Sequence, residues 1–325
     1  MSSSLGPTAV LAVRVCPADV GRRVTLRHRL PDDPRLSDVV GTLREWSGAE
    51  LVVVRRDGRE VRVPARDLVA ARVVRPEVGA YDVQAVAEKG WPPEHSEPLG
   101  DWTLRWTRGV TGRANSVRVG GDPPGPLGAV LEQVRAWYAR FDAPPLLQLP
   151  SPWTYDQELD ALGWSVRRRT AVLTAPVGAL VPAPAPGVVV TEVPGPDDRW
   201  LGVLHDEEPA TWPVLRSILA APSRVVFLAA HDSGTGELLG VGRGSAAVER
   251  TTRELWNGLT SIETVPAARR RGVARAVVAE LGRWAAEQGG GTAYLQVLTS
   301  NEAAKNLYGD IGFRLHHDYV YRAPT

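Results

Sequence analysis

The chain has 325 residues, a formal net charge of +1 and a single cysteine, Cys16. This length is enough for two or three hydrophobic cores, and the near-neutral charge gives no reason to expect a nucleic acid or a membrane surface as partner. One cysteine excludes an internal disulfide framework and favours a reducing, cytoplasmic location. The apolar stretch 8–13 lacks a preceding basic segment, so no signal peptide is expected, and no run reaches the roughly 20 apolar residues of a membrane span.

The N-terminal part predicts a leader followed by a small all-β barrel. Residues 1–19 are expected to form a flexible leader. Within residues 20–76, apolar and polar residues alternate over the runs 23–30, 39–44, 51–56 and 60–63. The pair Asp57-Gly58 is a tight hairpin signal. This pattern resembles an SH3-like module, which suggests a protein partner for residues 20–76.

The middle region, residues 77–178, predicts alternating strands and helices. Strands are expected at 102–106, 114–119, 146–149 and 165–174, and helices at 127–140 and 155–162. The order repeats the end of the chain, since Trp137 matches Trp284 and Gly163-Trp164 matches Gly312-Phe313 at offsets of 147 and 149 residues. We interpret it as a shortened copy of the C-terminal domain; the alternative is a coincidental strand-helix-strand similarity. A Pro/Ala-rich linker, 179–187, follows.

Residues 188–325 form the last predicted domain. Strands are expected at 188–193, 224–230, 238–248, 255–265 and 292–298, helices at 197–204 and 213–219, and terminal strands to Tyr321. Val273, Val277, Leu281 and Trp284 recur at helical spacing, so a helix with one apolar stripe begins near Gly272.

The turn before this helix has the chemistry of an anion site. Pro266 ends strand pairing because it has no backbone N–H. The first N–H groups of the helix lack partners within it, and the helix dipole favours an anion there. Small residues at Gly272 and Ala274 leave these groups accessible. Positive charge is added by Arg269, Arg270 and Arg271.

Two motifs in this region carry a family resemblance. The first is Arg/Gln-x-x-Gly-x-Gly/Ala, met by Arg269, Gly272 and Ala274. The second is Asn-x-x-Ala-x-x-Leu-Tyr-x-x-x-Gly-Phe, met by Asn301, Ala304, Leu307, Tyr308, Gly312 and Phe313. With these motifs the chain from Val188 onward resembles the GNAT superfamily of acyl-CoA-dependent N-acyltransferases. With its N-terminal module, the whole chain resembles an actinobacterial-type group of such proteins.

The resemblance implies an α/β fold with a mixed sheet, in which two central parallel strands splay apart around the pantetheine arm of acetyl-CoA. The middle region then becomes a degenerate GNAT-like unit. It is not expected to bind acyl-CoA, because Gly120-Gly-Asp-Pro-Pro-Gly-Pro126 replaces the phosphate turn with prolines and an acid. The implied binding residues for acetyl-CoA are Thr264, Val265, Arg269, Arg270, Arg271, Gly272, Val273, Ala274 and Asn301.

The resemblance also assigns an oxyanion donor and an acid. The backbone N–H of Val265 is expected to face the thioester carbonyl, an effect worth roughly 3 to 4 kcal/mol in other enzymes. Tyr308 matches the family tyrosine that faces the sulfur and would protonate the departing thiolate. Its alternative role is packing against Phe313, with the hydroxyl capping a backbone group.

The sequence marks the residue that would act as the general base less specifically than the acid. Glu263 is the one carboxylate on its strand after Glu254, and it shares a face with Ser261 and Val265, so it would accept the amine proton directly or through water. The alternatives are an ordinary edge charge or an anchor for a substrate ammonium. Glu207 and Glu208 would attract a cationic amine or remain solvated.

Other polar residues have structural interpretations. Asn301 contacts the cofactor arm or caps a helix, and both roles are compatible. Adjacent histidines in a strand point to opposite faces, so His316 and His317 predict no metal site.

The leading function is N-acetyl transfer from acetyl-CoA to a primary amine of a small molecule or protein, by direct attack in a ternary complex. The domain contains no cysteine that would form an acyl-enzyme. The alternative is a non-catalytic acyl-CoA sensor or scaffold. Nucleic-acid binding through residues 20–76 is not favoured, because arginine enrichment is spread over the whole chain.

Overall fold

The computed structural model describes residues 13–30, 33–55, 57–73, 78–180, 185–204 and 208–325. The chain divides into two compact units, residues 1–77 and 78–325. Each unit is described by itself.

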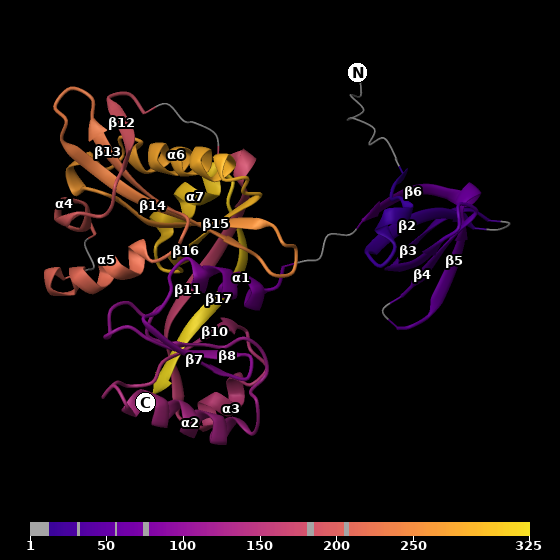
Figure 1. The fold of residues 1–325 in the computed structure, drawn as a ribbon, viewed down its shortest axis with the longest axis horizontal. Coiled ribbons are helices and arrows are strands. Elements are labelled where there is room, and N and C mark those ends of the chain that lie inside the picture. Colours follow the sequence, from indigo (N-terminus) through magenta and orange to yellow (C-terminus); the bar gives the residue numbers. More distant parts are fainter. Residues whose placement is uncertain (1–12, 31–32, 56, 74–77, 181–184, 205–207) are drawn as a thin grey trace, which may run out of the picture. The chain divides into compact units, whose positions relative to one another are not determined.

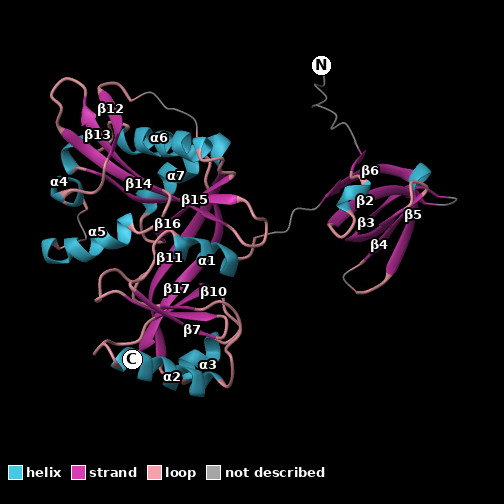
Figure 2. Cartoon of the chain, viewed as in Figure 1, coloured by secondary structure: helices cyan, strands magenta, loops and turns pink. Residues whose placement is uncertain are grey.

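The first unit is a small all-β domain built on one six-stranded sheet, drawn with its strands in magenta in Figure 2. Its strand order is β1-β6-β2-β3-β4-β5, with β1 (Val13–Arg14), β2 (Arg23–Leu30), β3 (Asp33–Trp46), β4 (Glu50–Val54), β5 (Glu60–Pro64) and β6 (Leu68–Val73), and short 3-10 turns at Pro17–Asp19 and Ala65–Asp67. The predicted hairpin is present, since β4 pairs with β5 and Gly58 has a φ of 82° between them. Alternate residues such as Val24, Leu26 and Val63 form the core. Residues 13 and 14, placed in the leader by the sequence, pair with β6.

The second unit is built on one eleven-stranded sheet, in the order β12-β13-β14-β15-β16-β11-β17-β10-β9-β8-β7. The strands are β7 (His95–Leu99), β8 (Trp102–Trp106), β9 (Val117–Arg118), β10 (Leu147–Ser151), β11 (Trp164–Pro176), β12 (Val188–Val193), β13 (Val225–Asp232), β14 (Leu238–Val248), β15 (Leu255–Thr264), β16 (Thr292–Leu298) and β17 (Arg314–Pro324). The helices are α1 (Ala80–Lys89), α2 (Leu127–Ala139), α3 (Asp156–Ala161), α4 (Asp198–Leu201), α5 (Trp212–Ala220), α6 (Val273–Glu287) and α7 (Glu302–Ile311), with 3-10 turns at Val177–Ala179, Pro209–Thr211 and Pro266–Ala268.

The strand order of this sheet is symmetric about its centre. Read outward from the β11–β17 pair, β16, β15, β14 and β13 on one side correspond to β10, β9, β8 and β7 on the other. The pairs β15–β16 and β9–β10 are both parallel, and each is bridged by a helix, α6 or α2. Figure 1 shows α6 and α7 at one end of the unit and α2 and α3 at the other. The two halves exchange their final strands. β11, the last strand of the first half, pairs with β16 of the second half, and β17, the last strand of the second half, pairs with β10 of the first.

The close contact between α6 and the sheet depends on three glycines of β14. A Cβ atom at Gly240, Gly242 or Gly244 would lie 2.8 Å, 2.3 Å or 3.1 Å from side-chain atoms of α6. These glycines are spaced by two residues, so they lie on the same face of the strand. The valines of the α6 stripe therefore rest directly on the backbone of β14, which fixes the start of α6 beside the end of β15.

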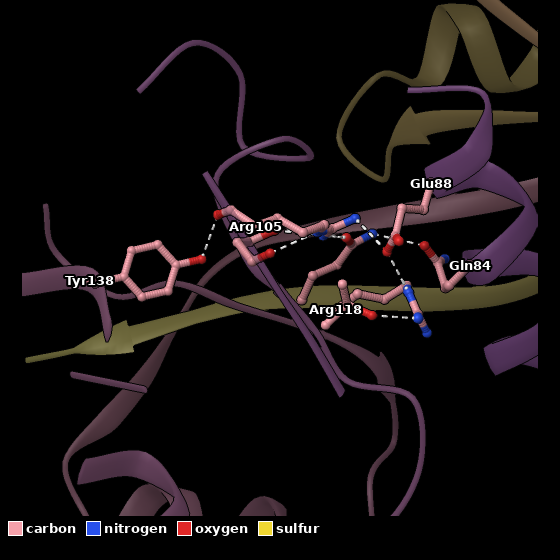
Figure 3. Close-up of polar contacts among 8 residues, drawn as sticks. Gln84, Glu88, Arg105, Arg118 and Tyr138 are labelled. Atoms are coloured by element: carbon pink, nitrogen blue, oxygen red, sulfur yellow. Dashed lines mark hydrogen bonds and ion pairs between the residues drawn. The ribbon is translucent and has the colours of Figure 1, made fainter. Parts of the chain in front are cut away.

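A buried polar cluster lies where α1 packs on β8, β9 and β10, toward one edge of the sheet (Figure 3). Arg105 on β8 is 2 % exposed and donates to the Ser116 carbonyl at 2.7 Å, while its Nη1 lies 3.5 Å from a carboxylate oxygen of Glu88. Glu88 on α1 also accepts from Arg118 at 2.6 Å. The helix α1, which the sequence does not predict, is thereby tied to β8 and β9.

Candidate active site

The two central parallel strands separate at the candidate site. β15 and β16 pair from Trp256–Thr292 to Leu259–Leu295 and no further. Beyond that point β15 continues along β14 as far as Thr264, while β16 continues along β11 as far as Leu298. A bulge in β15, where Ser261 has a φ of 51°, bends it away from β16. The resulting opening matches the splay that the family resemblance implies.

The turn between β15 and α6 presents unpaired amides. Arg270 and Gly272 have φ values of 67° and 82°, and Gly272 caps α6. The first helical bond runs from the N–H of Ala276 to the carbonyl of Gly272. Within the part of the chain that the structure describes, the N–H groups of residues 270–275 have no protein acceptor. Left-handed residues in such a turn direct successive N–H groups toward one point, which favours an anion.

The three arginines of this turn differ. Arg269 and Arg270 are exposed. Arg271 donates to Asp232 at 2.7 Å, and this bond is the main reason that the pKa of Asp232 falls to about 2. The predicted positive charge of Arg271 is therefore partly neutralised by a carboxylate at the end of β13, and Arg269 and Arg270 remain available to a phosphate.

The expectation that the Val265 N–H faces the thioester is wrong. This group donates to the Leu239 carbonyl at 2.9 Å, within the β14–β15 ladder, and the Val265 carbonyl accepts from Ala268. Backbone N–H groups alternate in direction along a strand. The N–H of Thr264, one residue earlier, therefore points away from β14, toward the opening beside β16.

Tyr308 on α7 is 8 % exposed and packs edge to face against Phe313, with ring centroids 5.8 Å apart. No partner for its hydroxyl is found among the described residues, so the alternative in which the hydroxyl caps a backbone group has no support. Burial raises the pKa of Tyr308 above its usual value, and the carboxylate of Glu263 adds to the rise. The phenol stays protonated at neutral pH and has a proton to donate.

The remaining predicted polar residues have local contacts. Asn301 is exposed and caps α7, since its side-chain oxygen accepts from the Ala304 N–H at 3.0 Å. Glu208 is exposed at the start of a 3-10 turn, and Glu207 lies outside the described residues.

The expectation that His316 and His317 face opposite sides of the strand is wrong. Their Nδ1 atoms are 2.8 Å apart and their rings meet edge to face. In the pairing with β11, Val172 and Leu173 lie opposite His317 and Leu315, so His316 is an extra residue in a β-bulge. The bulge breaks the alternation of side chains. His317 also contacts Gln84 at 2.8 Å, and burial lowers its pKa to about 4.

A pocket of about 440 Å³ lies over this part of the sheet. Glu263 and Ser261 of β15 line it together with Gln296 and Leu298 of β16, so it includes the walls of the opening. The rest of its wall comes from Trp91, Thr111, Gly112, Arg113, Arg168, Thr170, Leu204, Leu215, Tyr319 and Tyr321. The structure thus brings Glu263 to a pocket, whereas Tyr308 lies in the core beside it.

Sequence reasoning missed the part of this pocket contributed by residues 91–170. The sequence does not mark Arg113 or Arg168 as functional residues, because arginine is common throughout this chain. A local signal does exist at Thr111-Gly112, in the connection between the predicted strands 102–106 and 114–119. Thr111 has a φ of 63°, a conformation that β-branched residues rarely adopt, and such outliers concentrate at functional sites.

Two family models match the sequence. The model described as "Probable histone acetyltransferase Rv0428c C-terminal" matches residues 81–322. The model described as "Rv0428c N-terminal Sm-like domain" matches residues 18–72. The small all-β module is therefore confirmed, and the matching model describes it as Sm-like rather than SH3-like.

Individual relatives agree with these matches. An uncharacterized N-acetyltransferase, YobR, from Bacillus subtilis (strain 168) is 25 % identical over 248 residues, which cover 74 % of this chain and 96 % of the relative. A GCN5-related N-acetyltransferase from Kribbella flavida has a similar structure, with a TM-score of 0.56 and 15 % identity over 76 % of this chain and 96 % of that one. A conserved protein of unknown function from Staphylococcus epidermidis ATCC 12228 has a TM-score of 0.52 and 10 % identity over 74 % of this chain and 98 % of that one. The two structural likenesses concern the fold.

Among the described residues, no helix combines the length and the apolar character needed to cross a bilayer.

Proposed function

The chain belongs to the family described as "Probable histone acetyltransferase Rv0428c C-terminal", and from this premise we propose that it transfers an acetyl group from acetyl-CoA to a primary amine. It is a GNAT-type acyltransferase, so the alternative of a non-catalytic acyl-CoA sensor is not retained. The observation that carries the proposal is the separation of β15 and β16 beside the unpaired amides of residues 270–275.

The proposed cofactor site follows the opening. The amides of Arg270, Arg271, Gly272, Val273 and Ala274 would hold the diphosphate of acetyl-CoA, with Arg269 and Arg270 adding charge. The arm would lie between β15 and β16, with Asn301 at its side, since the amide nitrogen of Asn301 is not used by the cap. The N–H of Thr264 replaces that of Val265 as the donor to the thioester oxygen.

The proposed reaction is a direct aminolysis. The amine nitrogen forms a bond to the acetyl carbon, the carbon–sulfur bond breaks, and one proton passes in net from nitrogen to sulfur. Glu263 would accept the amine proton directly or through water. Tyr308 would supply the proton to the thiolate, because burial keeps its phenol neutral.

The symmetric strand order supports the interpretation of residues 77–178 as a degenerate GNAT-like unit. Its β9–β10 pair corresponds to β15–β16, but α2 begins after Pro126, in a turn with three prolines. A turn with fewer N–H groups is a poorer diphosphate site. We therefore assign acetyl-CoA to the C-terminal half alone. Residues 20–76 keep the proposed role of a protein contact.

The test is calorimetry of the full chain with acetyl-CoA, followed by measurement of free CoA released with a panel of amines. Binding with a stoichiometry of about one per chain and amine-dependent CoA release are expected. A lack of detectable heat at millimolar acetyl-CoA would overturn the cofactor assignment, and binding without CoA release from any amine would overturn the proposed transfer.

A further inference from the structure

The wall of the 440 Å³ pocket includes two arginines, Arg113 and Arg168, that have no carboxylate partner within the described part of the chain. Arg113 follows β8 in the loop of residues 107–116, and Arg168 lies on β11. Neither side chain has an ion pair or hydrogen bond with any described residue, whereas Arg167 and Arg169, on either side of Arg168, both bond to oxygen atoms. Two unpaired guanidinium groups in one pocket are a feature that a bound anion would explain.

Both guanidinium groups are held in place by aromatic rings. Arg113 lies 4.0 Å from the centre of the Trp91 ring, and Arg168 lies 4.9 Å from that of Tyr321. Trp91 and Tyr321 are 5 % and 2 % exposed, so the rings are fixed supports. Stacking leaves the edge of a guanidinium, with its N–H groups, free for an oxyanion.

Gly112 precedes Arg113 in the chain and lies against the side chain of Arg168. A Cβ atom there would lie 2.9 Å from a terminal nitrogen of Arg168 and 3.3 Å from the Tyr321 hydroxyl. A side chain at this position would occupy the space beside the Arg168 guanidinium and the Tyr321 ring. The preceding Thr111 is held in its left-handed conformation by a bond from the Trp91 indole N–H at 3.1 Å. The loop is thus fixed in a geometry that keeps this space open.

Unpartnered donors lie in the same wall. The buried hydroxyl of Tyr321 has no hydrogen-bond partner among the described residues, and neither has the buried amide nitrogen of Gln296, whose oxygen already accepts from Tyr319. Buried polar groups are normally satisfied, so unsatisfied ones lining a pocket point to a ligand. Both groups can donate to an oxyanion.

The charge around the pocket is unequal. Behind Trp91, the fully buried Arg243 bonds to the carbonyls of Leu219 and Gly90 and to Thr260, with no carboxylate partner among the described residues. Among the described residues of the pocket wall, Glu263 on β15 is the one carboxylate. The pocket is therefore positive toward Arg113 and Arg168 and negative toward the acyl-transfer site.

We infer that the acceptor amine also carries an oxyanion, a carboxylate or a phosphate, which binds between Arg113 and Arg168 while the amine lies toward Glu263. The inference rests on the proposed transfer reaction. A pocket of this volume suits a small molecule such as an amino acid. It does not suit a lysine-rich tail, whose flanking positive charges would face two unpaired cations.

The test compares matched amines on the full chain with saturating acetyl-CoA. The anionic members are the standard L-amino acids and O-phosphoethanolamine; their partners are the amino-acid carboxamides and ethanolamine. At least one anionic amine is expected to exceed its neutral partner about tenfold or more in kcat/KM. A higher kcat/KM for an amino acid than for its carboxamide indicates a carboxylate, and a higher kcat/KM for O-phosphoethanolamine than for ethanolamine indicates a phosphate. Equal or faster reaction of every neutral partner, or of a lysine-rich peptide, would overturn the inference and leave the transfer reaction in place.

Variants assign the preference to the two arginines. Arg168→Gln and Arg113→Gln are each expected to raise KM for the anionic amine about tenfold or more, and to lower the ratio of kcat/KM between the anionic amine and its neutral partner by a similar factor. Arg168→Lys should retain part of the preference, because it keeps the charge and loses the planar fork. The matched control is Arg167→Gln, on the same strand but bonded to the Pro324 carbonyl. It should leave KM for the anionic amine and the preference over the neutral partner unchanged. An anionic preference that survives in both arginine variants would contradict the assignment.

A binding experiment separates this inference from the transfer reaction. If no amine releases CoA, calorimetry of the full chain with the same anionic and neutral amines still reports on the pocket. Heat from an anionic amine alone that disappears in Arg168→Gln would support the anion site while the transfer proposal fails. An absence of heat from every anionic amine, together with an absence of turnover, would overturn both.

Discussion

Tyr308 has a hydroxyl that no described residue bonds, in a side chain that is 8 % exposed. A structural tyrosine normally satisfies its hydroxyl when it is buried. A phenylalanine at position 308 would pack against Phe313 equally well. The hydroxyl is therefore the group on which the proposed proton donation depends.

We expect Tyr308→Phe to lower kcat about a hundredfold, in the range of general acid catalysis, and to leave KM for acetyl-CoA within about twofold. The melting temperature should hardly change, since no hydrogen bond to a described residue is lost. Steady-state kinetics of CoA release and a thermal melt provide the measurements. The control is Tyr155→Phe in the middle region, where kcat should be unaffected. An unchanged kcat in Tyr308→Phe would leave Tyr308 a packing residue.

At the scale of elements, α6 connects the phosphate turn to the core. Its buried face rests on the glycines of β14, while its first turn keeps its amides free. The position of those amides is thus set by packing along the whole helix rather than by the turn itself. Gly272 is the residue where the two requirements meet, because its φ of 82° aims the first amides outward.

We expect Gly272→Ala to weaken acetyl-CoA binding about tenfold or more, because alanine resists the left-handed conformation and shifts the amides. The free energy of unfolding should fall by about 1 kcal/mol. Gly289→Ala is the matched control at the other end of α6, with a φ of 78° and open space around it. Gly289→Ala should lower the free energy of unfolding by a similar amount and leave the affinity for acetyl-CoA unchanged. Calorimetry and urea unfolding of both variants measure the two effects, and equal loss of affinity in both would contradict the proposed role of Gly272.

Several elements were predictable because their signal is local. The bounds of β2, β8, β14 and β16 agree with the sequence prediction, since each is an apolar or alternating run between turn residues. The helix α1 was missed because half of its buried positions hold Gln84 and Ala87 rather than large apolar residues. The bulge at His316 was missed because it arises from pairing with β11, which local periodicity does not reveal.

The candidate site divides in the same way. The turn before α6 and the position of Tyr308 on α7 were predictable because a family motif marks them. The direction of the Val265 N–H was predicted wrongly, since the direction of an N–H along a strand depends on its register with β14. Arg113 and Arg168 could not be found from the sequence, because they are far apart in the chain and no local pattern shows that both line one pocket.

At the scale of the molecule, the exchange of β11 and β17 between the two halves of the sheet makes residues 78–325 interdependent. β17 pairs with β11 along one edge and with β10 along the other, and both partners precede residue 188. A fragment 188–325 would keep β17 without either neighbour, and β16 would lose β11. Unpaired strands of this length expose many backbone groups and aggregate.

We therefore expect a fragment 188–325 to show no cooperative unfolding transition and no acetyl-CoA binding, and a fragment 78–325 to unfold in one transition and bind. Urea unfolding followed by tryptophan fluorescence, with calorimetry, tests both. Cooperative unfolding and acetyl-CoA binding by 188–325 would show that the two halves fold independently in spite of the shared sheet.

The stability of the same unit should also depend on pH through His317. Burial lowers the pKa of His317 to about 4, with a smaller contribution from the charge of His316. Its ring faces Gln84 and His316, and no carboxylate among the described residues bonds to it. The unfolded chain binds a proton at the ordinary histidine pKa of about 6.5, so protons favour unfolding between these two values.

The contribution of His317 is present in full above about pH 6.5 and is lost progressively as the pH falls toward 4, up to about 3 kcal/mol. We expect the free energy of unfolding, measured in urea at pH 7 and at pH 5, to fall less in His317→Gln than in the wild type. The control is His231→Gln on β13, which keeps the histidine pair intact. An identical pH dependence in His317→Gln and the wild type would show that the buried pair takes up its proton without opening the contact between β17 and α1.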